Sequence, residues 1–267
     1  MIRNVPILMY HSISDDAAPK FRRWTVRPNQ FRSHLTMVRL QGYTPLTVSD
    51  YVNRLNRRNL PEKPILITFD DGFEDFHTHA LPLLNEFEIS ATLYVTTGYV
   101  GDRSKWLSAA GEGERKMLSA KQILNLAQNR IEIGAHTVTH PQLDTIPEQQ
   151  AAHEIKHSKL WLEAILGAKV NSFAYPHGYY SPSVRKMVID AGFTSACGVK
   201  HALSHPRDDR FAMARIIVGN EITDQSLKTL LSGEGLREIS AGETLKTKMW
   251  RLYRKQSIRL NLAGSTL

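Results

Sequence analysis

Residues 64–72 read Pro-Ile-Leu-Ile-Thr-Phe-Asp-Asp-Gly, a mostly apolar run that ends at two aspartates and a glycine. Strands that are apolar on both faces are typical of a parallel sheet covered by helices on both sides. The run therefore predicts a buried parallel strand over residues 64–69. The aspartates would then lie at the carboxyl end of the strand, where parallel α/β folds place their functional sites.

Similar apolar runs lie on both sides of this strand and alternate with segments of helical spacing. Further strands are expected at residues 5–9, 91–96, 130–134, 172–175, 194–198 and 212–218. Helices are expected at residues 28–40, 80–87, 121–128, 145–166 and 182–191. Thr145 and Glu148 have the spacing of a capping box at the start of the fourth helix. This alternation of about seven strand–helix units predicts a parallel α/β fold, most simply a barrel.

The composition is that of a globular chain, with 267 residues of which 42% are hydrophobic and 22% charged. The single cysteine, Cys197, excludes an intrachain disulfide and a zinc site made of cysteines, and it favours a reducing compartment. The apolar run near the amino terminus is too short for a signal peptide, and no run is long enough for a membrane span. We therefore expect a cytoplasmic protein. The net charge of +8 suits an anionic partner or serves solubility alone. We expect no nucleic-acid partner, and the oligomeric state stays open.

Two pairs of polar residues follow predicted strands. Asp70 and Asp71 are adjacent carboxylates, which need a nearby positive charge such as a metal ion to stay ionised together. A helix N-cap is the alternative role for an aspartate after a strand. His136 and His140 are four residues apart, so on one face of a helical turn both could reach one metal ion. Two histidines and a carboxylate form a usual catalytic zinc set, although a lone pair of this spacing is often a surface pair.

Other motifs carry weaker signals. Residues 173–178 read Phe-Ala-Tyr-Pro-His-Gly, and the Pro and Gly predict a rigid turn whose backbone N–H groups could face a ligand. His11 ends the first strand, as an acid group or as a capping histidine. His153-Glu154-Ile155-Lys156-His157 matches the helical zinc-protease pattern. On a helical wheel both histidines fall opposite the apolar side, which argues against a protease site.

Taken in order, these motifs resemble the polysaccharide deacetylases of the NodB-homology group, carbohydrate esterase family 4. The matching stretches are residues 10–13, 68–72, 136–140 and 173–178, and the likeness runs from about residue 5 to residue 218. The first and last of these stretches are similar to the branch that acts on exopolysaccharide amino sugars. The resemblance implies a distorted seven-stranded β/α barrel and the removal of N-acetyl groups from an amino sugar in a polysaccharide, an oligosaccharide or a lipid-linked glycan.

The resemblance also implies roles for individual residues. Asp71, His136 and His140 would hold a divalent metal, usually zinc, and Asp70 would be the general base. Tyr175, Pro176 and Arg215 are expected on the substrate side of the site, together with an oxyanion-stabilising N–H at His177.

Two features depart from the family pattern. The arginine that pairs with the base in many members is absent from the third motif, and Arg215 is a candidate to replace it. The general acid stays open among His11, His177 and His205. These departures leave a barrel that only binds glycan as the competing function, with the protease as a third.

From residue 223 the strand–helix alternation fades, so we expect a barrel over residues 1–222 and a basic helical tail over residues 223–267. Apolar residues of the tail recur at helical spacing, at Leu245, Met249, Leu252, Tyr253 and Leu260. Six basic residues and no acidic residue lie among them: Lys246, Lys248, Arg251, Arg254, Lys255 and Arg259. A basic amphipathic helix suits an anionic membrane surface. A helix docked on the barrel with a solvated basic face is the other interpretation.

Overall fold

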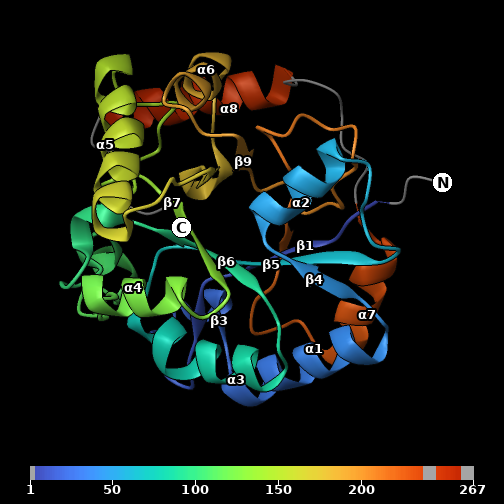
Figure 1. Cartoon of the computed structure of the whole chain (residues 1–267). Helices are drawn as coiled ribbons and strands as arrows, with labels where there is room; N and C mark the ends of the chain where they lie inside the picture. Colours follow the sequence, from blue (N-terminus) through green and yellow to red (C-terminus); the bar gives the residue numbers. More distant parts are fainter. Residues whose placement is uncertain (1–3, 237–244, 260–267) are drawn as a thin grey trace.

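The computed structural model describes residues 4–236 and 245–259 and shows a curled, parallel sheet with helices on its outside (Figure 1). Seven strands follow one another in the order β10 (Ile216–Ile217), β1 (Ile7–Tyr10), β5 (Pro64–Phe69), β6 (Ala91–Val95), β7 (Ile131–Ala135), β8 (Ser172–Ala174) and β9 (Ser195–Cys197). An eighth strand, β4 (Thr44–Leu46), pairs with the beginning of β5. The expected distorted (β/α)7 barrel of the deacetylase type is thereby confirmed.

The barrel is distorted where β9 and β10 meet. These two strands do not pair directly, and the segment 210–213 lies between them. The N–H of Met213 donates to the carbonyl of Ala196 (3.1 Å), and the N–H of Gly198 donates to the carbonyl of Met213 (2.9 Å). Irregular hydrogen bonds therefore close the sheet at this seam, and the expected strand at residues 212–218 is reduced to two residues.

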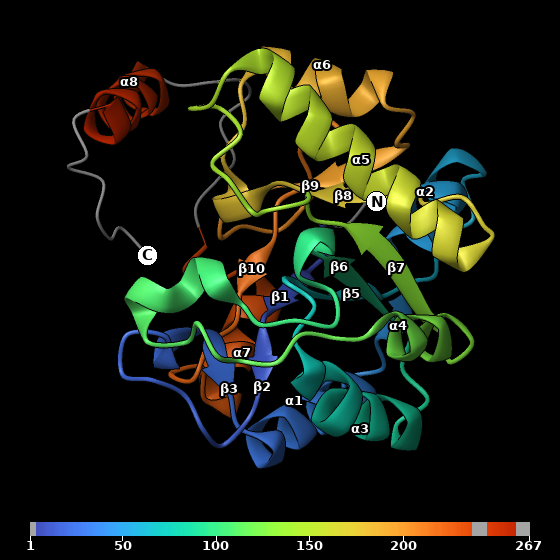
Figure 2. The same ribbon diagram turned by 90° about the vertical axis from the view of Figure 1, so that its left-hand side faces the viewer.

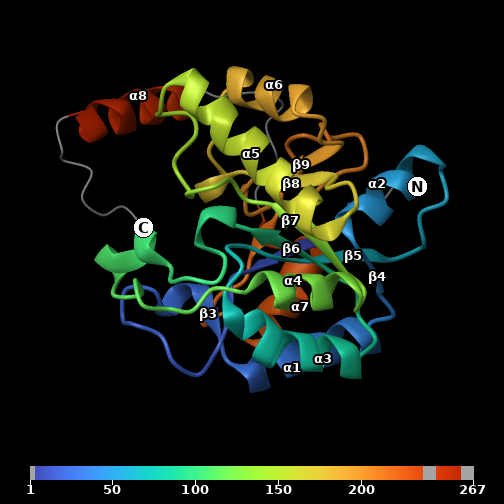
Figure 3. The same cartoon turned by 60° about the vertical axis from the view of Figure 1, so that its left-hand side comes forward.

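Helices cover the outer face of the sheet (Figures 1 and 3). They are α1 (Pro28–Leu40), α2 (Val48–Asn56), α3 (Leu81–Glu86), α4 (Ala120–Ala127), α5 (Glu148–Leu166), α6 (Pro182–Asp190), α7 (Asp224–Ser232) and α8 (Leu245–Arg259). The helices α1 to α7 pack through apolar side chains, as α1 does through Phe31, Leu35 and Val38, whereas α8 meets the protein through Arg251 and Arg254. The smaller elements are β2 (Ser12–Ile13), β3 (Thr25–Val26), the π-helical turn η2 (Phe76–Ala80) and the 3-10 turns η1 (Arg22–Trp24), η3 (Thr97–Tyr99), η4 (Lys105–Ala110) and η5 (Pro176–Gly178).

Aromatic rings fill the space between α1 and the sheet. Tyr10 on β1 lies opposite Phe69 on β5 in the strand register, and their rings stack at 5.3 Å. Phe31 from α1 and Phe76 from η2 pack edge-on against Phe69. These buried side chains hold the end of β5, and with it the two aspartates that follow, in a fixed position.

Two expectations about element boundaries were wrong. Helix α5 begins at Glu148 after Pro147, and Thr145 donates to the carbonyl of Gln142 instead of capping the helix. The proline disfavours a helical conformation for the residue before it, so the helix starts later.

Helix α7, assigned to a tail, packs in the barrel core through Leu227 and Leu231. The boundary at residue 223 therefore does not separate the barrel from an appended segment. Among the described residues no helix has the length and apolar character needed to cross a membrane.

Candidate active site

Five of the expected site residues lie at the carboxyl ends of neighbouring strands. His11 follows β1, Asp70 and Asp71 follow β5, and His136 follows β7. His177 belongs to η5, directly after β8. Because all these strands are parallel, their carboxyl ends meet at one rim of the barrel.

Asp71, His136 and His140 form a group with metal-ligand geometry, and one ligand atom from each lies within 4.8 Å of the others. The distances from Asp71 Oδ1 are 3.6 Å to His136 Nε2 and 3.3 Å to His140 Nε2. His136 Nδ1 lies 2.8 Å from the carbonyl of Ala174. A carbonyl can only accept, so Nδ1 carries the proton and Nε2 presents its lone pair toward Asp71.

The buried atoms of this group fit a bound cation. In the described part of the chain, Asp71 Oδ1, the atom that faces both histidines, is buried without a hydrogen-bond partner. Burial and the neighbouring Asp70 raise the pKa of Asp71 well above its usual range. Burial and nearby histidines lower the pKa of His140. A carboxylate that resists ionisation beside neutral imidazoles is a donor set that a divalent cation would stabilise.

Asp70 is held by a different partner. The guanidinium of Arg215 binds both carboxylate oxygens, at 2.6 and 2.7 Å, and also donates to the carbonyl of Gly198. Arg215 is completely buried. Burial alone would raise the pKa of Asp70, but Arg215 and then His136 outweigh it and lower the pKa below its usual value. Asp70 is therefore ionised at neutral pH.

Arg215 pairs with Asp70, as expected of a replacement for the family's arginine, but the substrate-side position expected for Arg215 and Tyr175 does not fit the geometry. Arg215 faces Asp70 and has no exposed surface, so it cannot line a substrate surface. Tyr175 and Pro176 are buried too, and the Tyr175 hydroxyl donates to the carbonyl of Phe211. The expectation that these side chains contact substrate is not supported, because their polar atoms are used inside the protein.

His136 and His140 converge through a strained loop and not through the helical turn expected from their spacing. Four of the eight non-glycine residues with positive φ among the described residues belong to the site: Asp71 (76°), Thr137 (69°), His140 (62°) and His177 (56°). Each such conformation costs about 1–3 kcal/mol unless the surroundings enforce it. Left-handed residues of this kind cluster at functional sites, where they re-aim side chains.

Glu154 on α5 enforces this loop. Its buried carboxylate accepts hydrogen bonds from the N–H groups of Val138 and Thr139, each at 2.8 Å, and from the Thr139 hydroxyl at 2.6 Å. Gly98 supports the loop from the other side, because its N–H donates to the Val138 carbonyl (2.8 Å) and an added Cβ would lie 2.6 Å from that oxygen. The loop that carries His140 is thus bonded on both sides.

The same contacts exclude the zinc-protease interpretation. Glu154 is engaged by the loop, so it is not available as the general base of such a site. His153 and His157 stack on each other at 3.9 Å, and neither belongs to the metal-ligand group formed by the described residues.

Aromatic side chains that the sequence analysis did not identify surround the histidines. Trp106 of η4 stacks on His140 at 5.5 Å, and Trp24 lies 4.8 Å from His11. On another side, the ring of His177 packs edge-on against His140, with 4.7 Å between the ring centres. The ring of Tyr179 stacks on His177, with 6.0 Å between the ring centres. In the sequence, Trp106 stands in a stretch rich in glycine, serine and charged residues, at 98–114. This isolated position is the one signal that could have identified it.

The candidates for the general acid are reduced to two. His11 is half-buried at the rim, and burial lowers its pKa to about 4 although Asp70 acts in the opposite direction. His177 is exposed at the rim. His205 lies elsewhere: its neighbour Ser204 pairs with Val5, which precedes β1 at the amino end of the barrel. His205 is therefore excluded as the acid.

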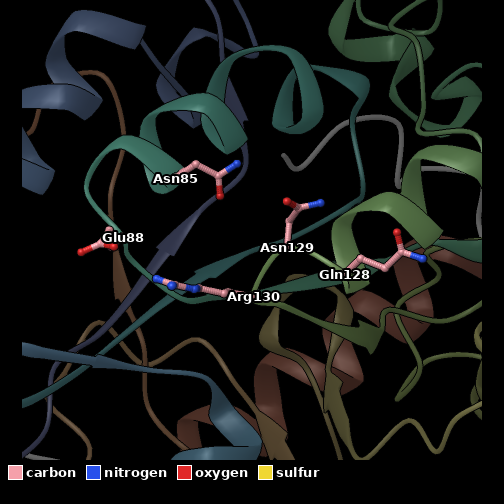
Figure 4. A pocket seen from close by; sticks show the side chains of 5 residues that line it. All are labelled: Asn85, Glu88, Gln128, Asn129 and Arg130. Atoms are coloured by element: carbon pink, nitrogen blue, oxygen red, sulfur yellow. The ribbon is translucent and has the colours of Figure 1, made fainter.

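A shallow hollow in Figure 4 also lies away from this site. Its lining residues are Asn85, Glu88, Gln128, Asn129 and Arg130. They precede β6 and β7, so the hollow lies at the amino ends of the strands and takes no part in the site.

A parallel β/α barrel with a histidine–aspartate metal group and a second, ionised aspartate at one rim defines a class of protein, the metal-dependent hydrolases. Residues 57–196 match the family model described as polysaccharide deacetylase. The chain belongs to the polysaccharide deacetylase family.

Known proteins similar to this chain agree with the assignment. YxkH of Bacillus subtilis (strain 168), which carries a polysaccharide deacetylase name, is 27% identical over 215 residues, or 80% of this chain and 71% of that protein. The poly-beta-1,6-N-acetyl-D-glucosamine N-deacetylase of Staphylococcus aureus (strain N315) is 19% identical over 221 residues, covering 79% of this chain and 74% of that protein. The structure of the Streptococcus pyogenes deacetylase PplD in complex with acetate matches with a TM-score of 0.75 at 25% identity, covering 86% of this chain and 99% of that one.

Proposed function

We propose that this protein is a zinc-dependent N-deacetylase that releases acetate from N-acetylated amino sugars in a glycan. The observation that carries the proposal is the arrangement of two adjacent aspartates in different environments. Asp71 points at His136 and His140, whereas Asp70 is paired with Arg215. One carboxylate is thus available to a metal ion, and the other is available as a base.

The residues divide the hydrolysis of an acetamide between them. Asp71, His136 and His140 would hold a divalent cation, which would polarise the amide carbonyl and lower the pKa of water. Asp70, ionised because of Arg215, accepts the proton of the attacking water. We assign stabilisation of the developing oxyanion to the backbone N–H of His177.

Protonation of the leaving amine falls to His11 or His177. The variants His11→Ala and His177→Ala distinguish them. Loss of the alkaline limb of the rate–pH profile with unchanged metal content identifies the acid. A profile that stays unaltered in both variants would exclude both histidines.

The surroundings of the site support a sugar substrate. Trp24 and Trp106 are partly exposed and place aromatic rings beside His11 and His140. Aromatic rings combine a large apolar face with defined geometry, which suits packing against a sugar ring. The similar Staphylococcus aureus enzyme is named for poly-beta-1,6-N-acetyl-D-glucosamine, so we propose a glycan of N-acetylglucosamine for this chain.

The decisive experiment measures acetate release and metal content together. We expect the zinc-loaded protein to release acetate from N-acetylglucosamine oligomers or polymers. Asp71→Ala should lose both metal and activity, with partial rescue at high zinc. Asp70→Asn should keep the metal and lose roughly 10²–10⁴-fold in rate, as expected for a general base.

The outcomes separate the competing functions. A metal-loaded protein that binds these glycans and releases no acetate would be the glycan-binding barrel instead. Metal loss in Asp70→Asn together with metal retention in Asp71→Ala would reverse the roles of the two aspartates.

We infer, in addition, a membrane surface as a second partner. The support for this contact is helix α8, which carries basic and no acidic residues and packs beside the loop that carries His177. A glycan attached to a lipid would meet the site there.

A further inference from the structure

Helix α8 is attached to the barrel by its arginine side. Arg254 binds both carboxylate oxygens of Asp144, at 2.8 and 2.7 Å, and its guanidinium lies 3.8 Å from the centre of the Tyr179 ring. Arg251 adds bonds to Asp144 (3.0 Å) and to the carbonyl of Tyr180 (3.1 Å). Asp144 and Arg254 are buried by these contacts. The charged face of the helix is therefore the face that contacts the protein.

The opposite face of α8 is apolar and exposed. Leu245, Met249, Leu252 and Tyr253 are spaced i, i+4, i+7 and i+8, and they are 74%, 63%, 60% and 59% exposed. At about 100° per residue they span one stripe. Figure 2 shows α8 nearly end-on at the edge of the molecule, with most of its circumference away from the barrel.

Lysines border this apolar stripe on both sides. With Leu245 at the origin of the wheel, Lys246 lies beyond one edge and Lys248 and Lys255 beyond the other, at about 100° per residue. The sequence of α8 contains no acidic residue. An apolar stripe between lysines is complementary to a lipid surface whose headgroups are negative and whose interior is apolar.

We propose that α8 is a surface helix that docks this protein on an anionic membrane through Leu245, Met249, Leu252 and Tyr253. This proposal rests on the membrane contact inferred above and specifies its face, its charge requirement and its relation to the site. Folded proteins seldom expose such a stripe without a partner. Arg251 and Arg254 bind Asp144, and we call this contact the arginine latch. The latch holds the helix against the barrel and leaves the apolar stripe facing outward.

The docked helix is connected to the active site through a short series of contacts. Arg254 lies over Tyr179, Tyr179 packs on His177, and His177 packs on the metal-ligand residue His140. A membrane bound by the outer face of α8 would therefore lie near the rim where the site opens. The substrate class that this geometry favours is an N-acetylated glycan attached to a lipid.

Flotation with vesicles tests the docking without reference to activity. The full chain should float with phosphatidylcholine vesicles that contain phosphatidylglycerol, and much less with phosphatidylcholine alone. The double variant Met249→Gln/Leu252→Gln should partition at least roughly tenfold more weakly, since two buried apolar side chains are lost. Lys246→Gln and Lys248→Gln should each weaken binding about fivefold, and added salt should do the same.

Leu40→Gln is the matched control. Leu40 is 83% exposed at the end of α1, so its replacement removes an exposed apolar side chain from another face and should leave flotation unchanged. We call Met249→Gln/Leu252→Gln the stripe variant. If it floats as well as the unchanged protein, the proposal is overturned. A dimer in solution that the stripe variant dissociates also overturns it, because the stripe would then bind a second copy.

The activity of the stripe variant on soluble oligomers separates this proposal from the proposed function. We expect that activity to be unchanged, because α8 touches the metal group only through intervening side chains. Flotation without any acetate release would leave the docking intact and refute the deacetylase.

Discussion

Arg215 and Asp70 form a buried ion pair, with side-chain exposures of 0% and 4%. The two residues are 145 positions apart in the chain. This pairing keeps Asp70 ionised beside the candidate metal ligands. In the proposed reaction the buried arginine would act through Asp70, as a positioning residue.

Replacing Arg215 should leave a buried charge without its partner. We expect Arg215→Met to lower the free energy of unfolding by about 3–5 kcal/mol, the range for breaking a buried pair by removing one partner. The double variant Arg215→Met/Asp70→Asn should recover part of this loss, because no uncompensated charge remains. Urea unfolding of the three proteins measures both effects.

The control for this prediction is a surface pair of the same type. Arg185 and Asp209 are paired at 35% and 38% exposure. Arg185→Met should change the free energy of unfolding by less than about 1 kcal/mol. Equal destabilisation by the two arginine replacements would contradict the assigned role of the Arg215 pair.

At the scale of elements, the loop between β7 and α5 depends on the helix that follows it. Glu154 on α5 accepts hydrogen bonds from the backbone of the loop that carries His140. These bonds hold a loop in which Thr137 and His140 are both left-handed. We expect Glu154→Gln to weaken metal affinity roughly tenfold or more, as loss of an outer partner of a metal site does. Metal titration followed by competition with a chelator measures it.

Glu148→Gln provides the comparison on the same helix, because Glu148 is exposed in the first turn of α5. Its metal affinity should match that of the unchanged protein. If Glu154→Gln also matches, the loop holds its conformation without the carboxylate.

The latch of α8 predicts a dependence on pH. Burial would raise the pKa of Asp144, but Arg254 and Arg251 lower it below the ordinary value of 3.8. A lowered pKa in the folded state means that the stabilisation is complete above the unfolded value and is lost as pH falls through the folded one. We expect the amides of α8 to be protected from hydrogen exchange near neutral pH and to lose protection below about pH 4.

Asp144→Asn should show the same loss of protection at neutral pH, while the strands of the barrel stay protected. Asp190→Asn removes an exposed partner of Lys186 and should have little effect. Protection of α8 that persists in Asp144→Asn would show that the latch does not hold the helix.

At the scale of the whole molecule, the barrel is one packed body whose single thiol lies inside it. Cys197 on β9 is completely buried, and burial raises its pKa to about 11. An alkylating reagent should therefore label the native protein very slowly at pH 8, and quickly once urea unfolds it. The midpoint of labelling should coincide with the loss of far-UV circular dichroism if the barrel unfolds as a unit. Rapid labelling in the absence of urea would mean that the seam beside β9 opens on its own.

The amino-acid sequence by itself predicted the parallel barrel and the rim on which the site lies. It did so because apolar runs and helical spacing are local signals of burial, and because parallel strands put all their carboxyl ends on one side. Asp70, Asp71, His136 and His140 were found for that reason: each stands directly after a strand or one loop beyond it.

Only the tertiary structure decided how those residues differ. Arg215 was a candidate partner from the sequence, but only the fold brings it from just before β10, 145 positions away, onto both oxygens of Asp70. The aromatic neighbour of His140, Trp106, comes from the short turn η4. The helical turn expected for His136 and His140 was wrong, because Glu154 and Gly98 bond a left-handed loop instead. Such contacts join residues far apart in the chain, and spacing along a sequence carries no signal of them. The same reason explains α8, whose amphipathic spacing was visible while the face turned toward the barrel was decided by Asp144.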